Sequence, residues 1–313
     1  MPYSAAALTG AETTGFDADK PMLVVQKALT ATDAEWTTTG DLSGSGDSQT
    51  DASFPGSRAH DDIGSLITKI RSDSAPISAA SPKYFNFEFG AGISFDTLLI
   101  LDHNFNSGGF TSVSLELADN DAFSSSVIEI GKYTVDGTTD NRILITNLNS
   151  AGGGSTYSSS GTAQRYSSVE RCRLKIEHSG SKTPALGEVF LGTRYQLQKN
   201  PDVPWDNKAE FSETTEFKAL SGLTRRYVRY RGQATRNLRS PIADSAEITV
   251  IEDWWDATEE GTRPFLYVET PSSAAKPYLM IMDTPALNFP LVGPFERVLA
   301  FSMTEQPPYL SRE

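Results

Sequence analysis

The side chains most able to bind a metal or act as a nucleophile are few in this chain. They are one cysteine and three histidines: Cys172, His60, His103 and His178. No pair of histidines has the His-x-x-x-His spacing, and one cysteine can form neither a Cys-x-x-Cys ligand pair nor an intramolecular disulfide. The sequence therefore predicts no metal site. Cys172 falls in the strand-like run 169–176, where we expect a small buried hydrophobe.

No motif of a known catalytic mechanism occurs. His60 stands beside Asp61 and Asp62, but adjacent residues on a loop face different ways, so we do not expect a catalytic set. The sequence contains no Gly-x-Ser-x-Gly elbow, no P-loop and no Gly-x-Gly-x-x-Gly after a strand. We expect no enzyme, no catalytic residues and no cofactor. A glycan-cleaving enzyme stays open as a third class, because the separation of two carboxylates is a three-dimensional quantity.

Four polar loop residues are the candidates for ligand binding. His103 and Asn104 follow an apolar strand, and Asp119 and Asp121 flank Asn120 in a turn. Their oxygens and nitrogens could bind a sugar, and the aspartates could hold calcium, although the EF-hand spacing is absent. The alternatives are a histidine that anchors its loop through nearby backbone, and a solvated turn at the aspartates.

A basic cluster and two tryptophans are the candidates for a subunit interface. The arginines are Arg225, Arg226, Arg229 and Arg231, followed by Arg236 and Arg239. They form either a solvated strand face or a contact with the acidic surface of another copy, where arginine can pair bidentately with carboxylates. Trp254 and Trp255 lie on the apolar side of a predicted helix and join this expected interface.

Composition excludes several functions. The 313 residues carry a net charge of −13, which argues against nucleic-acid binding and against an anionic membrane surface. No stretch approaches the roughly 20 apolar residues of a membrane-spanning helix, and the N-terminus lacks the pattern of a secretory signal. We expect a protein without a nucleic-acid partner or membrane insertion.

Strand patterns dominate the chain. Phe85, Phe87 and Phe89 alternate with polar residues, as in a strand with one buried face. Short strand candidates separated by turn residues continue to Tyr195, which is typical of an antiparallel sandwich. We expect an N-terminal arm (residues 1–20), a sandwich (21–195) and a smaller β-rich domain (196–313). The last contains one amphipathic helix, from Asp244 to Glu260, with a capping box formed by Asp244 and Glu247.

Residues from about 58 to 193 resemble the discoidin-like, or galactose-binding-like, jelly roll. The motifs that carry the resemblance are Ile70-Arg71-Ser72-Asp73, the run from Tyr84 to Gly90, Asp96 to Asn104, Val113 to Asn120, Arg171 to Ile176, and Leu186 to Gly192. The resemblance implies an all-β fold with a jelly-roll β-sandwich. It transfers no ligand residue, because the binding loops of that family vary.

The chain also resembles virion structural proteins of tailed bacteriophages. This similarity rests on His103-Asn104-Phe105, Leu191-Gly192 and Glu305-Gln306-Pro307. It implies a non-enzymatic tail-tip or baseplate subunit, assembled in the host bacterial cytoplasm and located in the virion tail. Its partners would be copies of itself and other tail proteins. The alternative is a carbohydrate-binding adsorption module that recognises a host-surface glycan with the loops around His103, Asn104 and Asp119.

Overall fold

The computed structural model describes most of the chain, in segments. These are residues 4–7, 20–37, 50, 52–53, 55–59, 68–69, 82–105, 109–124, 126–135, 142–146, 148, 164–178, 183–201, 208–211, 214–218, 224–228, 233–269, 277–283, 286–291 and 297–305. The chain folds into two compact units, one from residues 1–18 and 26–194 and the other from residues 19–25 and 195–313. The structure therefore groups residues 19–25 with the C-terminal unit, whereas the sequence pattern placed 21–25 in the sandwich.

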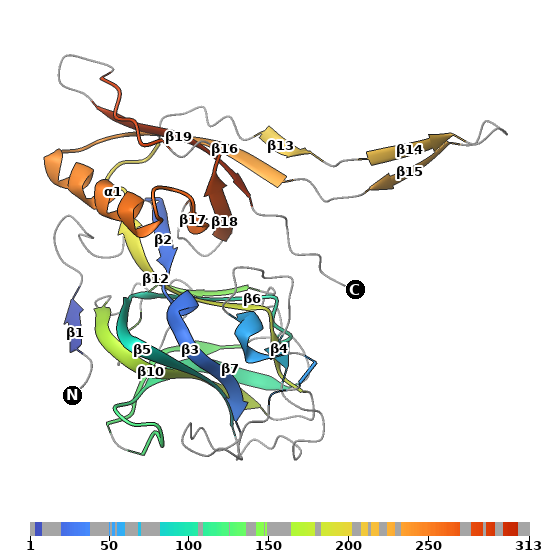
Figure 1. The fold of residues 1–313 in the computed structure, drawn as a ribbon, viewed down its shortest axis with the longest axis vertical. Helices are drawn as coiled ribbons and strands as arrows, with labels where there is room; N and C mark the ends of the chain where they lie inside the picture. Colours follow the sequence, from blue (N-terminus) through green and yellow to red (C-terminus); the bar gives the residue numbers. More distant parts are fainter. Residues whose placement is uncertain are drawn as a thin grey trace. The chain divides into compact units, whose positions relative to one another are not determined.

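The first unit is a sandwich of antiparallel sheets (Figure 1). One sheet has the order β3-β5-β10-β7-β8 with β1 paired to β10, and the other brings together β12, β6 and β9. The strands are β1 (Ser4–Ala7), β3 (Ala31–Thr37), β5 (Lys83–Phe95), β6 (Thr97–Leu101), β7 (Phe110–Leu117), β8 (Ile128–Thr134), β9 (Arg142–Ile145), β10 (Gln164–His178) and β12 (Glu188–Gln196). A short pair, β4 (Thr68–Lys69) with β11 (Ala185–Leu186), and two 3-10 turns, η2 (Ala28–Thr30) and η3 (Gly56–Ala59), complete it.

The order of strands along the chain gives the jelly roll. The chain changes sheets from β5 to β6, from β6 to β7, from β8 to β9 and from β9 to β10. Such repeated crossing wraps the two sheets around one core. The predicted fold class, a jelly-roll sandwich followed by a β-rich unit with one helix, is confirmed.

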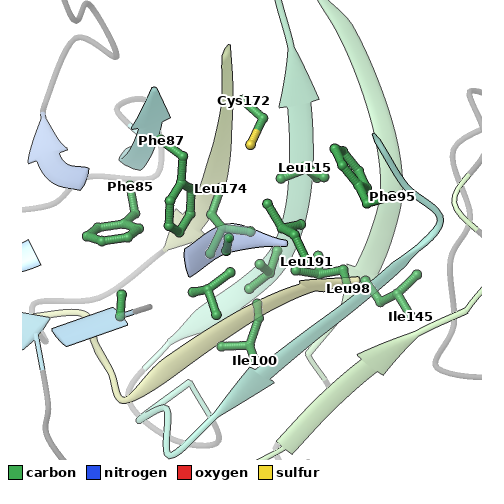
Figure 2. Packing of buried hydrophobic residues seen from close by; sticks show 14 of the residues in the cluster. Phe85, Phe87, Phe95, Leu98, Ile100, Leu115, Ile145, Cys172, Leu174 and Leu191 are labelled. Carbon is green, nitrogen blue, oxygen red and sulfur yellow. The ribbon is translucent and has the colours of Figure 1, made fainter. Parts of the chain in front are cut away.

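Period-two alternation builds the core of the sandwich. Phe85, Phe87 and Phe89 are buried on β5, and Phe85 and Phe87 meet edge to face with ring centroids 4.9 Å apart. Cys172 and Leu174 of β10 are their register partners. Figure 2 shows Phe85, Phe87, Cys172 and Leu174 facing a layer from the other sheet that includes Leu98, Ile100, Ile145 and Leu191. The predicted strand with a buried aromatic face is confirmed.

A bulge marks the pairing of β5 with β10. The register shifts between Tyr166 and Val169, and Ser168 has a φ of 58°. The backbone of Gly92 lies so close to the backbone of Ser168 that a Cβ added to Gly92 would be only 2.7 Å from it. Only glycine fits this approach without a shift of backbone.

The second unit is a six-stranded antiparallel array with one helix. Its strand order is β13-β16-β19-β18-β17-β2. The strands are β2 (Met22–Gln26), β13 (Lys208–Phe211), β16 (Gln233–Pro241), β17 (Phe265–Val268), β18 (Pro277–Met282) and β19 (Val298–Glu305), and β14 (Thr214–Lys218) pairs with β15 (Thr224–Val228) as a separate ribbon. The helix is α1 (Ser245–Ala257). In the described part of the chain, no helix is long and apolar enough to cross a membrane.

Helix α1 begins where its sequence predicts. The Asp244 carboxylate accepts a hydrogen bond from the Glu247 N–H at 2.9 Å. Glu247 in turn accepts from the N–H groups of Ala243 at 2.5 Å and Gln198 at 2.8 Å. The first bond satisfies a donor that the helix N-terminus leaves without an intrahelical partner, and the other two tie the helix to the preceding chain and to residue 198. The helix ends at Ala257, one turn before Gly261, whose φ of 76° suits a glycine.

Candidate functional site

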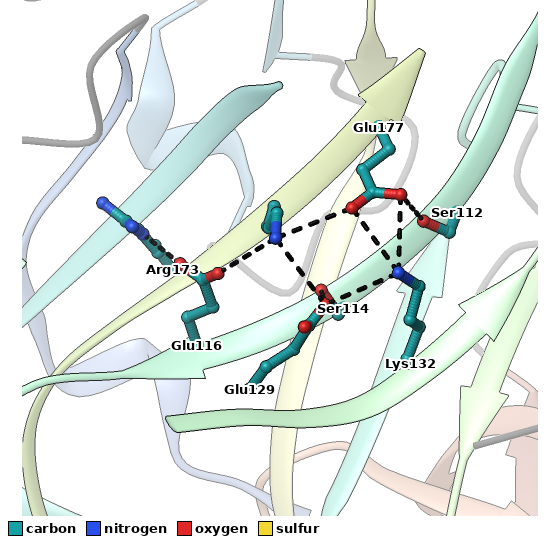
Figure 3. Close-up of polar contacts among 8 residues, drawn as sticks. Ser112, Ser114, Glu116, Glu129, Lys132, Arg173 and Glu177 are labelled. Atoms are coloured by element: carbon teal, nitrogen blue, oxygen red, sulfur yellow. Dashed lines mark hydrogen bonds and ion pairs between the residues drawn. The ribbon is translucent and has the colours of Figure 1, made fainter. Parts of the chain in front are cut away.

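The outward face of the sandwich sheet carries a network of charged side chains. On β10, residues alternate between the core and this face, so Arg171, Arg173, Lys175 and Glu177 all point outward while Cys172 and Leu174 point inward. Neighbouring strands β5, β7 and β8 contribute the partners of these residues. Figure 3 shows the part of the network that crosses β10, β7 and β8.

Arg173 is held on three sides. Its Nε donates to Glu116 Oε2 at 2.7 Å, and its guanidinium carbon lies 4.0 Å from the ring centroid of Tyr84 and 4.2 Å from that of Phe123. Burial is the main cause that raises the pKa of Tyr84, with Arg173 opposing it. This arrangement fixes one orientation of a cation between two aromatic rings.

The loop 118–127 carries the second of these rings. Phe123 has a φ of 46° and Ser126 a φ of 53°, a left-handed conformation that is uncommon for a bulky side chain. The Asn120 side chain accepts a hydrogen bond from the Ser124 N–H at 3.1 Å, which closes the turn. Strained backbone of this kind persists where surrounding contacts determine it and is concentrated at binding sites.

Arg171 connects the same loop to the sheet. It forms an ion pair and hydrogen bond with Asp121, and lies 3.6 Å from Glu88 and 3.1 Å from Glu170. Burial alone would lower the pKa of Arg171, but the bond with Asp121 and the nearby carboxylates outweigh it and raise the pKa. The three carboxylate side chains remain 38 to 50% exposed. They therefore offer oxygen atoms to solvent while their orientation is fixed.

Two lysines offset the negative charge of the glutamates in the rest of the network. Lys175 lies within 3.4 Å of Glu116 and 3.6 Å of Glu177, and Lys132 lies 3.4 Å from Glu177. The Ser112 hydroxyl donates to Glu177 at 2.7 Å. This hydrogen bond is the main cause that lowers the pKa of Glu177, and the two lysines add to it. Glu177 therefore stays ionised at neutral pH.

A second ionic cluster in the first unit is centred on two side chains that are closed to solvent. Asp96 and Arg194 have no exposed side-chain surface, and their Oδ1 and Nε atoms are 3.4 Å apart. Asp96 also accepts from Arg165 Nε at 3.0 Å and from the Arg194 N–H at 3.0 Å. Burial is the main cause that lowers the pKa of Arg194. A ligand in solution has no access to these groups, so they are structural.

The structure places His103 and Asn104 in a tightly bonded loop. His103 is 4% exposed, stacks on Phe105 with centroids 4.8 Å apart and accepts a hydrogen bond from the Phe105 N–H at 3.1 Å. Asn104 donates to Thr183 O at 2.8 Å and accepts from Ala185 N–H at 3.0 Å. This is the loop-anchoring arrangement that the sequence offered as the alternative to ligand contact.

The four candidate ligand residues do not form one site. His103 and Asn104 precede β7, whereas Asp119 and Asp121 follow it. Eight residues of extended chain separate the two ends by about 25 Å. Asp121 belongs to the Arg171 cluster, and Asp119 is half-buried in the same loop. The two pairs of candidate residues thus lie at opposite ends of β7.

The candidate interface residues have different environments. Trp254 is fully buried in its own unit, where it meets Phe265 edge to face at 5.0 Å and stacks on Phe301 at 5.4 Å, so its ring has no surface to offer another chain. Trp255 is half-buried against the same core. Arg225 and Arg226 are on β15. Arg229 and Arg231 lie outside the described residues.

Two further arginines of the basic cluster also differ from each other. Arg236 is 7% exposed, lies 3.1 Å from Glu269 and covers the Tyr278 ring at 4.2 Å, whereas Arg239 is exposed. Arg236 is thus a structural residue of the second unit.

Five residues of this surface were not predicted from the sequence: Tyr84, Glu88, Phe123, Arg171 and Arg173. The signal available was the run of alternating basic residues in the strand 171–175, which predicts one charged face. It could not show that loop 118–127 folds onto that face. Among the described residues, no group of three or more histidine, cysteine, aspartate or glutamate side chains is arranged to hold a metal ion.

Comparison with known proteins adds structural similarity only. No protein-family model matches the sequence, and no curated protein matches it. A Clostridium perfringens module, CpGH89CBM32-5, solved with GalNAc-β-1,3-galactose, is 12% identical over 51% of this chain and 93% of its own, with a TM-score of 0.32.

Two further solved structures are similar to the same extent. The family 32 carbohydrate-binding module of C. perfringens NanJ, in complex with galactose, is 9% identical over 55% of this chain and 98% of its own, with a TM-score of 0.34. A chitosan-binding module from a Paenibacillus sp. IK-5 chitosanase/glucanase is 13% identical over 54% of this chain and 98% of its own, with a TM-score of 0.33. At these values, neither the identity nor the TM-score assigns the chain to a family.

Proposed function

We propose that this chain is a non-enzymatic carbohydrate-binding protein, and that the sugar binds on the outer face of β10 beside loop 118–127. The observation that carries the proposal is the cluster around Arg171. There, Glu88, Asp121 and Glu170 are partly exposed while one guanidinium holds all three in place.

The chemistry of this surface suits a polyhydroxylated ligand. Carboxylates accept hydrogen bonds from sugar hydroxyls, and a guanidinium donates in a planar fork. The half-buried ring of Tyr84 supplies apolar surface next to Arg173, and the buried ring of Phe123 packs on the same guanidinium. Because ion pairs already fix these side chains, binding would cost little conformational entropy.

Calorimetric titration with defined sugars tests the proposal. The three modules described above supply the first probes: galactose, GalNAc-β-1,3-galactose and chitosan oligosaccharides. We expect one of these sugars, or another on a glycan array, to bind the full chain. Arg171→Gln should then weaken binding at least about tenfold, since a charge-assisted hydrogen bond is lost and three carboxylates are released.

Two controls separate a local effect from misfolding. Arg239→Gln changes an exposed arginine on β16 of the second unit and should leave the affinity unchanged. Asp121→Asn keeps the size of the side chain and removes one charge, so it should weaken binding less than Arg171→Gln. A sugar that binds both arginine variants equally well, with their circular dichroism spectra unchanged, would rule out this surface.

A second candidate is the tail-tip or baseplate subunit of a bacteriophage virion, which the sequence resemblance implied. None of the three structures described above is a virion protein. The observation that favours an assembly role is the separate β14–β15 ribbon, which carries Arg225 and Arg226. Electron microscopy of purified particles, with this chain located by antibody labelling, tests it. Absence of the chain from particles that are otherwise complete would exclude this candidate.

A further inference from the structure

The β14–β15 ribbon continues a longer hairpin of the second unit. The antiparallel pairing begins with Lys208 opposite Thr235 in β13 and β16 and ends with Lys218 opposite Thr224 in β14 and β15. Both pairs fit one register apart from a small shift. The four strands are therefore the inner and outer halves of one hairpin.

The outer half has no third strand among the described residues. Strand β19 pairs with β16 from Thr235 toward Pro241, so the sheet stops where the ribbon begins. In the described chain, β14 and β15 pair with each other alone. A two-stranded ribbon is marginally stable in water by itself and presents unpaired backbone groups along both edges. Its five-residue strands extend about 16 Å beyond the sheet.

The register determines which residues share a face of the ribbon. Thr215 opposes Tyr227, and Phe217 opposes Arg225. Because residues two apart in a strand lie on the same face, Phe217, Arg225 and Tyr227 occupy one face together. Aromatic residues and arginine are enriched at the energetic centres of protein interfaces.

The hairpin has the opposite charge to the rest of the chain. Residues 213–231 contain five basic and two acidic residues, a net charge of +3. The remainder then has 22 basic and 38 acidic residues, a net charge of −16. A second copy of this chain is therefore an electrostatically suitable partner for the ribbon.

The C-terminal end of α1 is a complementary surface in the same unit. Glu252, Asp253, Asp256, Glu259 and Glu260 are all exposed there, and the last turn contains no basic residue. The helix dipole already makes this end negative, so carboxylates here are unfavourable for the helix. Arg263 lies 2.6 Å from Glu259 and offsets part of this charge.

We propose that the β14–β15 ribbon of one copy binds the acidic end of α1 on a second copy. The contact brings the ribbon face that carries Arg225 to the end of α1 that carries Glu252 and Asp256, and Arg226 lies on the opposite face of the ribbon. The two surfaces are different, so the contact is head-to-tail and produces a closed ring or an open chain. The inference is independent of sugar binding, because it involves only the second unit.

Sedimentation of the full chain in low and high salt tests the contact. We expect species larger than the monomer in low salt, and dissociation in about 1 M salt, where the Debye length falls to about 3 Å. The hairpin variant Arg225→Ser with Tyr227→Ser, and the helix variant Glu252→Ser with Asp256→Ser, should each weaken association about tenfold or more. A wild-type chain that stays monomeric at its highest soluble concentration in low salt overturns the proposal.

Mixing the two variants gives the sharper result. The hairpin variant keeps an intact helix surface and the helix variant keeps an intact hairpin, so an equal mixture should form dimers that grow no further. A mixture that remains monomeric, although the wild type assembles, would place the interface elsewhere. Asp256→Ser alone is compared with Asp33→Ser, which removes an exposed carboxylate from β3. If the two variants lose association equally, the loss is caused by the change in net charge, and the specific contact with α1 is overturned.

Discussion

Replacement of Glu247 by alanine should destabilise the second unit by about 2–4 kcal/mol. The carboxylate accepts hydrogen bonds from Ala243 N–H at 2.5 Å and Gln198 N–H at 2.8 Å, and its side chain is almost fully buried. Each donor left without a partner costs about 1–3 kcal/mol, and the lower end applies because both bonds are only partly buried. Loss of a negative charge at a helix N-terminus adds about 0.3–1 kcal/mol.

Urea denaturation followed by hydrogen exchange of the α1 amides measures this loss. Glu252→Ala is the matched control, because Glu252 is an exposed carboxylate on the same helix and its removal should change stability by less than about 0.5 kcal/mol. Glu247→Gln keeps one acceptor oxygen and should fall between the two. If Glu247→Ala and Glu252→Ala unfold at the same urea concentration, the carboxylate does not anchor the helix as described.

Three other changes give independent checks of the packing. Trp254→Ala should destabilise the second unit by about 3–5 kcal/mol, because removing a fully buried indole leaves a large cavity. Trp255 is half-buried, so Trp255→Ala should lower the free energy of unfolding by less. Equal unfolding midpoints of the two variants in denaturant would contradict the packing of α1. Gly92→Ala should cost about 1–3 kcal/mol, because its Cβ would lie 2.7 Å from Ser168 backbone; Gly90→Ala, which meets only the Thr32 side chain at 3.1 Å, is the milder control. Burial raises the pKa of the Cys172 thiol, so the folded thiol stays protonated while the unfolded one ionises near about pH 8.5. Its contribution to the free energy of unfolding is full below that pH and should fall by about 1.4 kcal/mol per pH unit above it; denaturation of Cys172→Ala over the same pH range should lack this slope, and identical pH profiles would show that the thiol is not buried.

Local patterns were sufficient to predict the elements of the fold. Alternation of phenylalanine with polar residues predicts β5, since a half-buried strand needs that period. The spacing of Asp244 and Glu247 predicts the start of α1, since a side chain three residues away can reach the free N–H groups of the first turn. Both depend on residues that are neighbours in sequence.

Arrangements that join distant segments could not be predicted in this way. Nothing near Met22 indicates that β2 pairs with β17, about 240 residues later. The two tryptophans of α1 are adjacent in sequence, but only the packing of Phe265 and Phe301 around Trp254 decides which is fully buried. Likewise, Arg236 belongs to a basic run in the sequence. Its ion pair with Glu269 and its contact with the Tyr278 ring, both from distant segments, hold it within the second unit.

The sequence pointed to one residue of the surface that we propose for sugar binding. Asp121 was identified from its turn, yet its role depends on Arg171, fifty residues later on another strand. His103 was grouped with it because both lie on loops between strands. Sequence does not show that β7 holds those loops at opposite ends, which is why the four residues were expected together.

The pairing of β2 with β17 has a consequence for biosynthesis. A ribosome releases Met22–Gln26 long before Phe265–Val268 has been translated, so the early apolar strand Met-Leu-Val-Val-Gln must wait without its partner. Unpaired apolar strands promote aggregation in nascent chains. A C-terminal truncation made to isolate the sandwich would leave the β17 edge of this strand permanently unpaired, and fusing residues 19–25 to the C-terminal half is the way to express the second unit by itself.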